Sequence, residues 1–232
     1  MQSQWLEQYA DPKHRKMLFP NGPAAVGTIF LDFLAQNGEL QTGKTLVDLG
    51  CGNGRNAFPL AKLGFNVMGV DGIPQAINDA NEKNQSETLS EKLSFVLQDL
   101  AESTWNIESD QFDYAIDINT FSSLDRRTQR NYRNELKRIL HTGSLYFLYT
   151  YTVKDEYYRQ FVTNDTADDG QPGTKIVCAD DQVTRILYSR DELVTFFSPT
   201  FELVYEEEKI RYGKMFDEYY KRNFQVLIFK NN

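Results

Sequence analysis

The 232-residue sequence contains little cysteine, little histidine and no long apolar run. Its two cysteines, Cys51 and Cys178, are too few for a disulfide framework or a cysteine-based zinc site. Two histidines do not support a histidine-rich metal site, so we expect no metal. No segment approaches the roughly 18 apolar residues of a membrane-spanning helix, and residues 1–16 lack the apolar core of a signal peptide. We therefore expect a cytoplasmic protein without membrane contact.

The sequence also has fewer basic than acidic residues. Lysine and arginine number 25 against 33 aspartate and glutamate residues, which gives a net charge of −8 at pH 7. Because a nucleic-acid-binding surface needs excess positive charge to neutralise phosphates, we expect no nucleic-acid partner. The apolar share of 41% is enough for a sizeable core and argues against disorder.

Short apolar segments alternate with helical segments over the first two thirds of the chain. The alternation predicts an α/β fold, a Rossmann-like, mostly parallel sheet with helices on both faces. Ligands of such sheets lie beyond the carboxyl ends of the strands. The expected strands are 44–49, 65–70, 93–97, 112–118 and 144–152, and the expected helices are 57–63, 74–83 and 125–141.

The alternation stops after residue 153. Residues 163–182 are polar, acidic and rich in turn formers, which predicts a long loop. A helix is expected at 189–197, where Ser189 and Glu192 have the spacing of a capping box. Two further strands are expected at 200–206 and 223–230, and the charged stretch 205–222 between them is interpreted as a solvated loop or helix.

No linker divides the chain. We expect one domain over residues 1–232, which includes a helical cover at 1–36 with a helix at 23–37. Residues 153–188 are expected to form an inserted cap or lid.

Three glycines follow the first expected strand. Gly50, Gly52 and Gly54 alternate as G-x-G-x-G, two residues after Asp48. Glycine permits positive φ and lets a ligand approach the backbone, and the following helix start offers free N–H groups. Asp71 ends the second strand, where a carboxylate can accept both hydroxyls of a ribose. The pattern predicts a nucleotide-like ligand.

Two familiar nucleotide motifs do not match. The dinucleotide pattern G-x-G-x-x-G fails because Arg55 occupies its last position, and no Gly-Lys-Ser/Thr of a phosphate loop follows. The string from Asp48 to Gly54 instead resembles motif I of class I S-adenosylmethionine-dependent methyltransferases. Asp71-Gly72-Ile73 and Gln98-Asp99-Leu100 resemble later segments of that family.

The resemblance implies a seven-stranded sheet whose last strand, 223–230, is antiparallel. It also implies an S-adenosylmethionine cofactor, with S-adenosylhomocysteine as product. Residues 116–121, together with Trp5 and Tyr9, are similar to the thiopurine and tellurite-resistance group of small-molecule methyltransferases, although the Arg and Gly of that group's Asp-Arg-Gly segment are absent.

The same resemblance assigns roles to individual residues. Asp71 would bind the ribose, Ile73 would pack on the adenine, and Asp99 would meet the adenine amino group. Asp48 would bind the cofactor amino group or only order the glycine loop, and Asp117 would border the cofactor or position the substrate. The expected cofactor residues are Asp48, Gly50, Cys51, Gly52, Asn53, Gly54, Asp71, Gly72, Ile73, Asp99, Leu100 and Asp117.

Cys51 lies at a helix start, where a thiolate would be favoured, but its simpler role is that of a small side chain beside the cofactor. No residue is identified as a catalytic base. Candidates for substrate contact, chosen by position, are Tyr9, Asn119, Tyr151 and Asp155.

The expected activity is therefore methyl transfer to a small-molecule acceptor by in-line displacement, in which the protein mainly aligns the reactants. The alternatives are a protein or peptide methyltransferase, a non-catalytic S-adenosylmethionine-binding accessory protein, and a nucleotide-dependent oxidoreductase. A monomer or a homodimer is expected.

Overall fold

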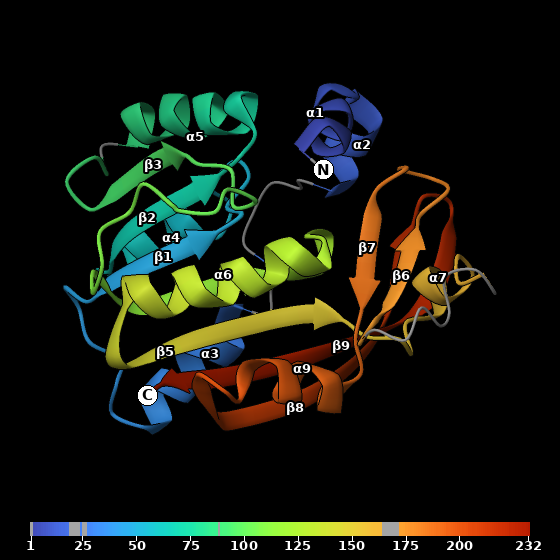
Figure 1. The fold of residues 1–232 in the computed structure, drawn as a ribbon. Helices are drawn as coiled ribbons and strands as arrows, with labels where there is room; N and C mark the ends of the chain where they lie inside the picture. The colour runs from blue at the N-terminus through green and yellow to red at the C-terminus, as the bar shows by residue number, and fades with distance from the viewer. Residues whose placement is uncertain (1, 19–23, 25–26, 88, 164–171) are drawn as a thin grey trace.

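The computed structural model describes residues 2–18, 24, 27–87, 89–163 and 172–232. Its centre is a seven-stranded sheet in the order β3-β2-β1-β4-β5-β9-β8 (Figure 1). The first five strands are parallel, and β9 runs antiparallel to β5, so the predicted architecture is confirmed. The strands are β1 (Thr45–Leu49), β2 (Asn66–Asp71), β3 (Leu93–Leu97), β4 (Phe112–Ile118), β5 (Leu140–Tyr151), β8 (Phe201–Met215) and β9 (Glu218–Asn231).

Helices cover both faces of the sheet because its central strands are apolar on both sides. On one face, Phe30 of α3 (Gly27–Gln36) packs against Phe147 of β5, and Phe58 of α4 (Ala57–Lys62) belongs to the same core. Helix α5 (Pro74–Glu87) lies beside α4, where Lys83 sits over the ring of Phe58. On the other face, Tyr132 of α6 (Arg126–Ile139) and Phe197 of α9 (Arg190–Phe197) belong to a second core.

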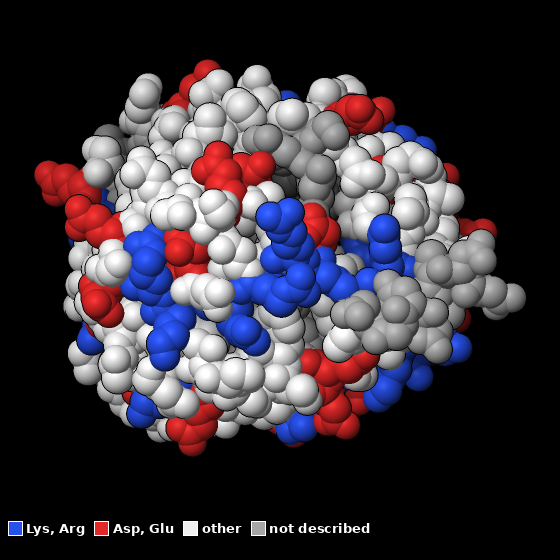
Figure 2. Space-filling view, in the orientation of Figure 1, with Lys and Arg blue, Asp and Glu red and all other residues white. Residues whose placement is uncertain are grey.

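Helix α6 is amphipathic, with an apolar face and a basic face. Asp125 caps its N-terminus by accepting a hydrogen bond from the Thr128 amide. Lysine and arginine side chains form a band across the face of the molecule on which α6 lies (Figures 1 and 2). Exposed positions of α6 hold Arg127, Arg130 and Lys137. Positive charge is therefore concentrated on this face, although the protein as a whole is negatively charged.

Local signals in the sequence set most element boundaries. The capping box at Ser189 and Glu192 is present at the start of α9, as predicted. The helix expected over 125–141 ends at Ile139, and β5 begins directly at Leu140 rather than at residue 144. The chain therefore passes from helix to strand without the gap between residues 141 and 144 that separates the two expected elements.

The interpretation of 205–222 as a solvated loop or helix is wrong. Strands β8 and β9 pair over nearly their whole length, from Phe201 opposite Asn231 to Met215 opposite Glu218. The outer strand β8 is at the sheet edge and alternates exposed with partly buried positions. Its charged residues are compatible with a strand because an edge strand faces solvent.

Further elements gather at the carboxyl ends of the parallel strands. From the N-terminal region come α1 (Gln2–Ala10) and α2 (Pro12–Leu18). Within 153–188, α7 (Glu156–Arg159) precedes a hairpin of β6 (Thr174–Val177) and β7 (Thr184–Leu187). Strand β6 lies in the segment predicted as a loop, 163–182, and β7 follows that segment. Residues 164–171 of that segment are outside the described residues. Among the described helices, none is both long and apolar enough to cross a membrane.

Candidate functional site

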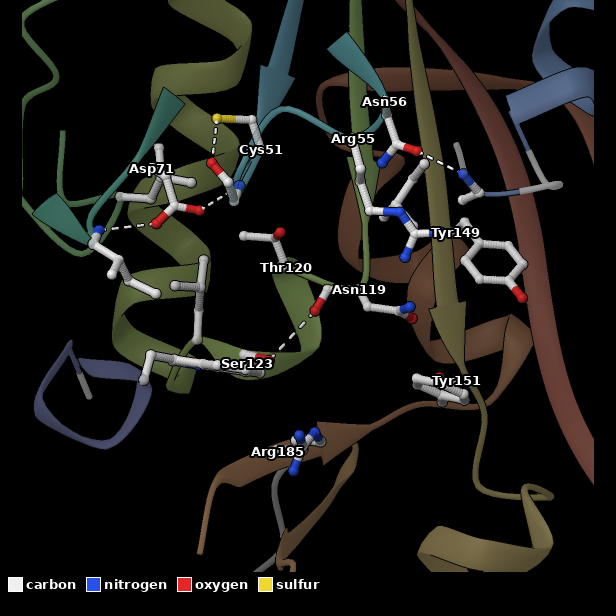
Figure 3. Close-up of a pocket in the computed structure, with 18 of the residues that line it drawn as sticks. Cys51, Arg55, Asn56, Asp71, Asn119, Thr120, Ser123, Tyr149, Tyr151 and Arg185 are labelled. Atoms are coloured by element: carbon white, nitrogen blue, oxygen red, sulfur yellow. Dashed lines mark hydrogen bonds between the residues drawn. The ribbon is translucent and has the colours of Figure 1, made fainter. Parts of the chain in front are cut away.

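A cavity of about 420 Å³ lies at the carboxyl ends of the parallel strands. The turns after β1, β2 and β3 line one part of it, and the ends of β4 and β5 line the other. Figure 3 shows Cys51 and Asp71 on one side, Tyr149 and Tyr151 on the other, and Asn119 between them. The expected cofactor residues that line the cavity are Gly50, Cys51, Gly52, Asn53, Asp71, Gly72, Ile73, Asp99 and Leu100.

The glycine loop after β1 requires glycine for two separate reasons. Gly50, Gly52 and Gly54 have φ values of 75°, 55° and 79°, a region that other residues rarely adopt. A Cβ on Gly50 would also lie 2.0 Å from Oγ1 of Thr120 in the turn after β4. The loops after β1 and β4 are therefore in direct contact, and both line the cavity.

Asp71 anchors the glycine loop to the end of β2. Its carboxylate accepts a hydrogen bond from the Gly52 amide at 2.8 Å and another from the Ile73 amide at 2.9 Å. Burial raises the pKa of this carboxyl, and the backbone N–H donors oppose that rise. Asp71 thus holds the loop in place while it borders the cavity.

Asp48 and Asp117 are not lining residues, in contrast to the prediction for both. Each is fully buried beneath the cavity, on the neighbouring strands β1 and β4. Asp117 accepts hydrogen bonds from the Tyr132 hydroxyl at 2.7 Å and from the amides of Thr120 and Phe121. It therefore orders the turn that carries Thr120. Gly54 is not a lining residue either, and a Cβ there would lie 2.6 Å from the ring of Phe95 and 2.9 Å from that of Phe58.

Burial makes both carboxyls weak acids. Desolvation, followed by the charges of Asp117 and Asp71, raises the pKa of Asp48 to about 8. Desolvation raises the pKa of Asp117 to about 7, against the effect of its hydrogen-bond donors. Oδ2 of Asp48 has no hydrogen-bond partner among the described residues, which adds to the cost of its ionised form.

This arrangement predicts an unusual dependence of stability on pH. Between pH 4 and pH 8 the folded protein holds more protons on Asp48 than the unfolded chain does, so its contribution to stability falls as the pH rises. We expect the free energy of unfolding of Asp48→Asn, relative to the wild type, to rise by roughly 3 kcal/mol from pH 5 to pH 8. Denaturant unfolding of the ligand-free proteins measures this difference.

The matched control for the pH experiment is Asp113→Asn, at the opposite end of the sheet. Asp113 accepts hydrogen bonds from Lys44 and Thr45, and its pKa is lowered rather than raised. Its effect on stability should therefore stay constant between pH 5 and pH 8. If the free energy of unfolding of Asp48→Asn also differed from that of the wild type by a constant amount between pH 5 and pH 8, Asp48 would be ionised over this whole range, contrary to this account.

Asn119 is placed in the cavity by the turn after β4. Its φ of 68° is unusual for a residue with a side chain, although asparagine tolerates it better than most. Its amide donates to the Tyr149 carbonyl at 2.9 Å. Its side-chain oxygen is buried without a hydrogen-bond partner among the described residues, as is that of Asn53. Both residues line the cavity, so both oxygens are candidates for contact with a polar ligand.

Two of the four residues expected to contact substrate line the cavity, Asn119 and Tyr151. Tyr9 does not, because its hydroxyl donates to Asp79 of α5 at 2.6 Å and its ring packs against Ile73. Asp155 does not either, because it is fully buried, caps α7 and forms an ion pair with Arg222 at 2.8 Å. Neither residue is placed to touch a ligand in this structure.

Several lining residues were not predicted from the sequence. Trp5 of α1 reaches the cavity, whereas only its role in the cover was expected. Many of the other additions surround the β4 and β5 end, and those with basic or aromatic side chains are Arg55, Tyr149, Tyr158, Arg185, Arg211, Lys214 and Arg222. The remaining additions are Ala24, Asn56, Ala101, Ile118, Thr120, Ser123, Leu124, Gly213 and Met215.

Cys51 is a buried residue of the glycine loop, 3% exposed. Burial, followed by the charges of Asp71 and Asp48, raises the pKa of its thiol well above the ordinary value. The thiolate suggested by its position at a helix start is therefore disfavoured. The structure fits the simpler interpretation, a small side chain in the wall of the cavity.

The lining residues fit a nucleoside that carries an amino-acid tail. Asp71 can accept from ribose hydroxyls, and Ile73 and Leu100 offer apolar surface to a base. The Cβ-free loop at Gly50 and Gly52 leaves its backbone open to close approach by a ligand. The volume lies within the usual range of small-molecule sites, about 300–1,000 Å³.

Comparison with known proteins identifies the family. The model of a methyltransferase domain matches residues 40–215. A methyltransferase of Schizosaccharomyces pombe is 36% identical over 125 residues, which cover 52% of this chain and 83% of the relative.

Solved structures share the fold. A 1,6-didemethyltoxoflavin N1-methyltransferase of Burkholderia thailandensis, solved with 1,6-didemethyltoxoflavin and S-adenosylhomocysteine, has a TM-score of 0.72 at 16% identity. The alignment covers 100% of this chain and 87% of that one. A methyltransferase of Methanosarcina mazei has a TM-score of 0.70 at 21% identity, over 85% of this chain and 96% of that one. From the family match, its relatives and the fold, we conclude that the chain belongs to the methyltransferase domain family and is an S-adenosylmethionine-dependent methyltransferase.

Proposed function

We propose that the protein transfers a methyl group to a small-molecule acceptor bound at the β4 and β5 end of the cavity. The observation that carries the proposal is the continuity of this cavity. It joins Asp71 and Ile73, on one side, to Asn119 and Tyr151, on the other. The α1 helix contributes Trp5 to the lining of the same cavity.

Residues of the β1, β2 and β3 ends would hold the cofactor. Asp71 accepts the ribose hydroxyls, Ile73 and Leu100 pack on the adenine, and Asp99 accepts from the adenine amino group. Asp48 and Asp117 support this site from below, since they are buried under the loops that carry the lining residues. Asn53 and Asn119 offer unpaired side-chain oxygens to the polar parts of the ligands.

The chain promotes the transfer by alignment and by excluding water. S-adenosylmethionine, when bound, supplies a methyl group activated by its positively charged sulfur. Among the described lining residues there is no histidine and no glutamate, and the two aspartates, Asp71 and Asp99, lie at the cofactor end. Among the described residues, therefore, no carboxylate or imidazole base faces the acceptor. This suits an acceptor atom that is already deprotonated when it binds, and leaves proximity as the main source of rate enhancement.

The segments outside the central sheet would select the acceptor. Residues 1–36 contribute Trp5 to the cavity, and 153–188 contribute Tyr158 and Arg185. We therefore assign part of the acceptor specificity to these two segments, with 153–188 as a cap over the site; the β8–β9 hairpin contributes the rest of the wall around the acceptor.

Methyl-labelled S-adenosylmethionine provides the test. The protein is incubated with small thiols, phenols, amines and metalloid anions, and in parallel with a mixture of soluble proteins. We expect label in low-mass products, and we expect little in precipitated protein. Label found only in precipitated protein would overturn the proposal in favour of a protein methyltransferase.

A protein that bound S-adenosylhomocysteine yet labelled neither fraction would count against turnover and in favour of a cofactor-binding accessory role. The control is the Asp71→Ala variant, in which labelling of the low-mass fraction should fall to background.

A further inference from the structure

The two ends of the cavity carry opposite charges. Its only lining carboxylates among the described residues, Asp71 and Asp99, are at the cofactor end. Five basic residues line the remainder, around Tyr149 and Tyr151, in a protein whose net charge is −8. They are Arg55, Arg185, Arg211, Lys214 and Arg222.

Buried aspartates neutralise part of this charge. Arg185 donates two hydrogen bonds to Asp181, at 2.9 Å and 2.6 Å. Nε of Arg222 donates to Asp155 at 2.8 Å. No ion pair joins Arg211 or Lys214 to an acid in the part of the chain that the structure describes. Positive charge is therefore left over at the acceptor end.

Two of these arginines directly oppose each other in the sheet. Arg211 of β8 pairs with Arg222 of β9, so their side chains leave the hairpin on the same face. Like charges at directly opposed positions destabilise a strand pair. The side chain of Arg222 is only 3% exposed, so water cannot reach most of it. Its Nη2 has no hydrogen-bond partner among the described residues. A cationic donor of this kind is costly to bury unless something accepts its hydrogen bond.

Aromatic rings fix the two guanidinium groups. Arg222 lies 4.5 Å from the ring centre of Tyr151 and 5.2 Å from that of Tyr158. Arg211 lies 4.8 Å from the ring centre of Phe224. Cation–π contacts hold the charges in place without neutralising them.

We infer that the acceptor carries an anionic group, a carboxylate or a similar oxyanion, bound between Arg211 and Arg222. An oxyanion would relieve the repulsion of the opposed pair and accept the unused hydrogen bond of Arg222. The tyrosines around it suit an acceptor with an aromatic ring. The inference rests on the proposed small-molecule function, and it specifies the class of acceptor.

Benzoate and benzamide are a matched pair of probes, since they share a ring and differ in charge. Calorimetry measures their binding to the complex of the protein with S-adenosylhomocysteine. We expect benzoate to bind at least about tenfold more tightly than benzamide, the smallest effect typical of a charged hydrogen bond. Equal binding of the two probes would overturn the inference.

Variants locate the effect. Arg211→Met should remove the preference for benzoate, whereas Lys209→Met, two residues away on the same face of β8, should keep it. Lys209 pairs with Glu207 and is not a lining residue. A preference that survived Arg211→Met would contradict the assignment, provided that thermal unfolding shows both variants to be folded.

Cofactor analogues exclude the remaining explanation. The arginines could bind the carboxylate of the cofactor's amino-acid tail, which 5′-methylthioadenosine lacks. If Arg211→Met weakened S-adenosylhomocysteine but not 5′-methylthioadenosine, the inference would be wrong. Benzoate binding requires no turnover, so this test remains separate from that of the proposed function, whose failure would appear as labelled protein without labelled small products.

Discussion

Replacement of Gly50 by alanine is expected to weaken both the fold and cofactor binding. The new Cβ would meet Oγ1 of Thr120 at 2.0 Å, and the residue would have to adopt a φ of 75°. Strain in φ costs about 1–2 kcal/mol, and the overlap adds about 1–3 kcal/mol or forces the loops apart. We expect Gly50→Ala to lower the free energy of unfolding by about 2–5 kcal/mol and the affinity for S-adenosylhomocysteine by at least about tenfold.

Gly43 is the matched control for this substitution. It has a φ of 83°, but a Cβ there would meet nothing within 4 Å. Gly43→Ala should therefore show the cost of φ strain alone, with unchanged affinity for S-adenosylhomocysteine. Adding Thr120→Gly to Gly50→Ala should recover part of the loss. Equal affinities for Gly50→Ala and Gly43→Ala would mean that the contact between the β1 and β4 loops does not shape the site.

The Asp71→Ala variant should lose cofactor binding more completely. The substitution removes the acceptor for the Gly52 and Ile73 amides and, in the proposed complex, the acceptor for the ribose hydroxyls. Hydrogen bonds to a charged group contribute about 1.5–3 kcal/mol each. We expect the dissociation constant for S-adenosylhomocysteine, measured by calorimetry, to rise at least about 100-fold.

Asp113→Ala separates this effect from a general loss of stability. Asp113 is also a strand aspartate that accepts a backbone hydrogen bond, from Thr45, but it is at the opposite end of the sheet. That variant should be less stable yet bind S-adenosylhomocysteine as the wild type does. An Asp71→Ala protein that retained wild-type affinity would show that the ribose is bound elsewhere.

The central sheet and the cofactor end could be predicted from the sequence because their signals are local. Strands β1 to β4 are short apolar runs, and the glycines after β1 have little reason to alternate in that way unless the backbone must turn and approach a ligand. The burial of Asp48 and Asp117 beneath the cavity could not be predicted from local sequence signals. Whether an aspartate at a strand end faces a cavity or lies beneath it depends on the loops that cover it.

The strands expected at 200–206 and 223–230 correspond to parts of β8 and β9, but the hairpin between them escaped prediction because its sequence lacks both usual strand signals. The partly buried positions of 205–210 are Tyr205, Glu207 and Lys209, so apolar and polar residues do not alternate. The turn at Phe216 and Asp217 contains no glycine or proline, and Phe216 takes a φ of 51°. Tertiary pairing with β5 through β9 overrides the weak local preference.

The acceptor end could not be predicted for the same reason. Arg211 and Arg222 are 11 positions apart in the sequence and meet only because the hairpin pairs them. Arg185 comes from a second hairpin, within the segment 153–188 predicted only as a cap or lid. Tyr9 and Asp155, chosen by position alone, are occupied instead with Asp79 and Arg222. Only the tertiary structure shows these partnerships.

A crystal structure of the protein with S-adenosylhomocysteine is the most direct test of the account. It predicts the ribose hydroxyls on Asp71, the adenine against Ile73 and Leu100, and the sulfur directed toward Asn119 and Tyr151. A ligand with its ribose away from Asp71, or with its sulfur directed away from the arginine-lined end, would contradict the proposed arrangement of cofactor and acceptor in one cavity.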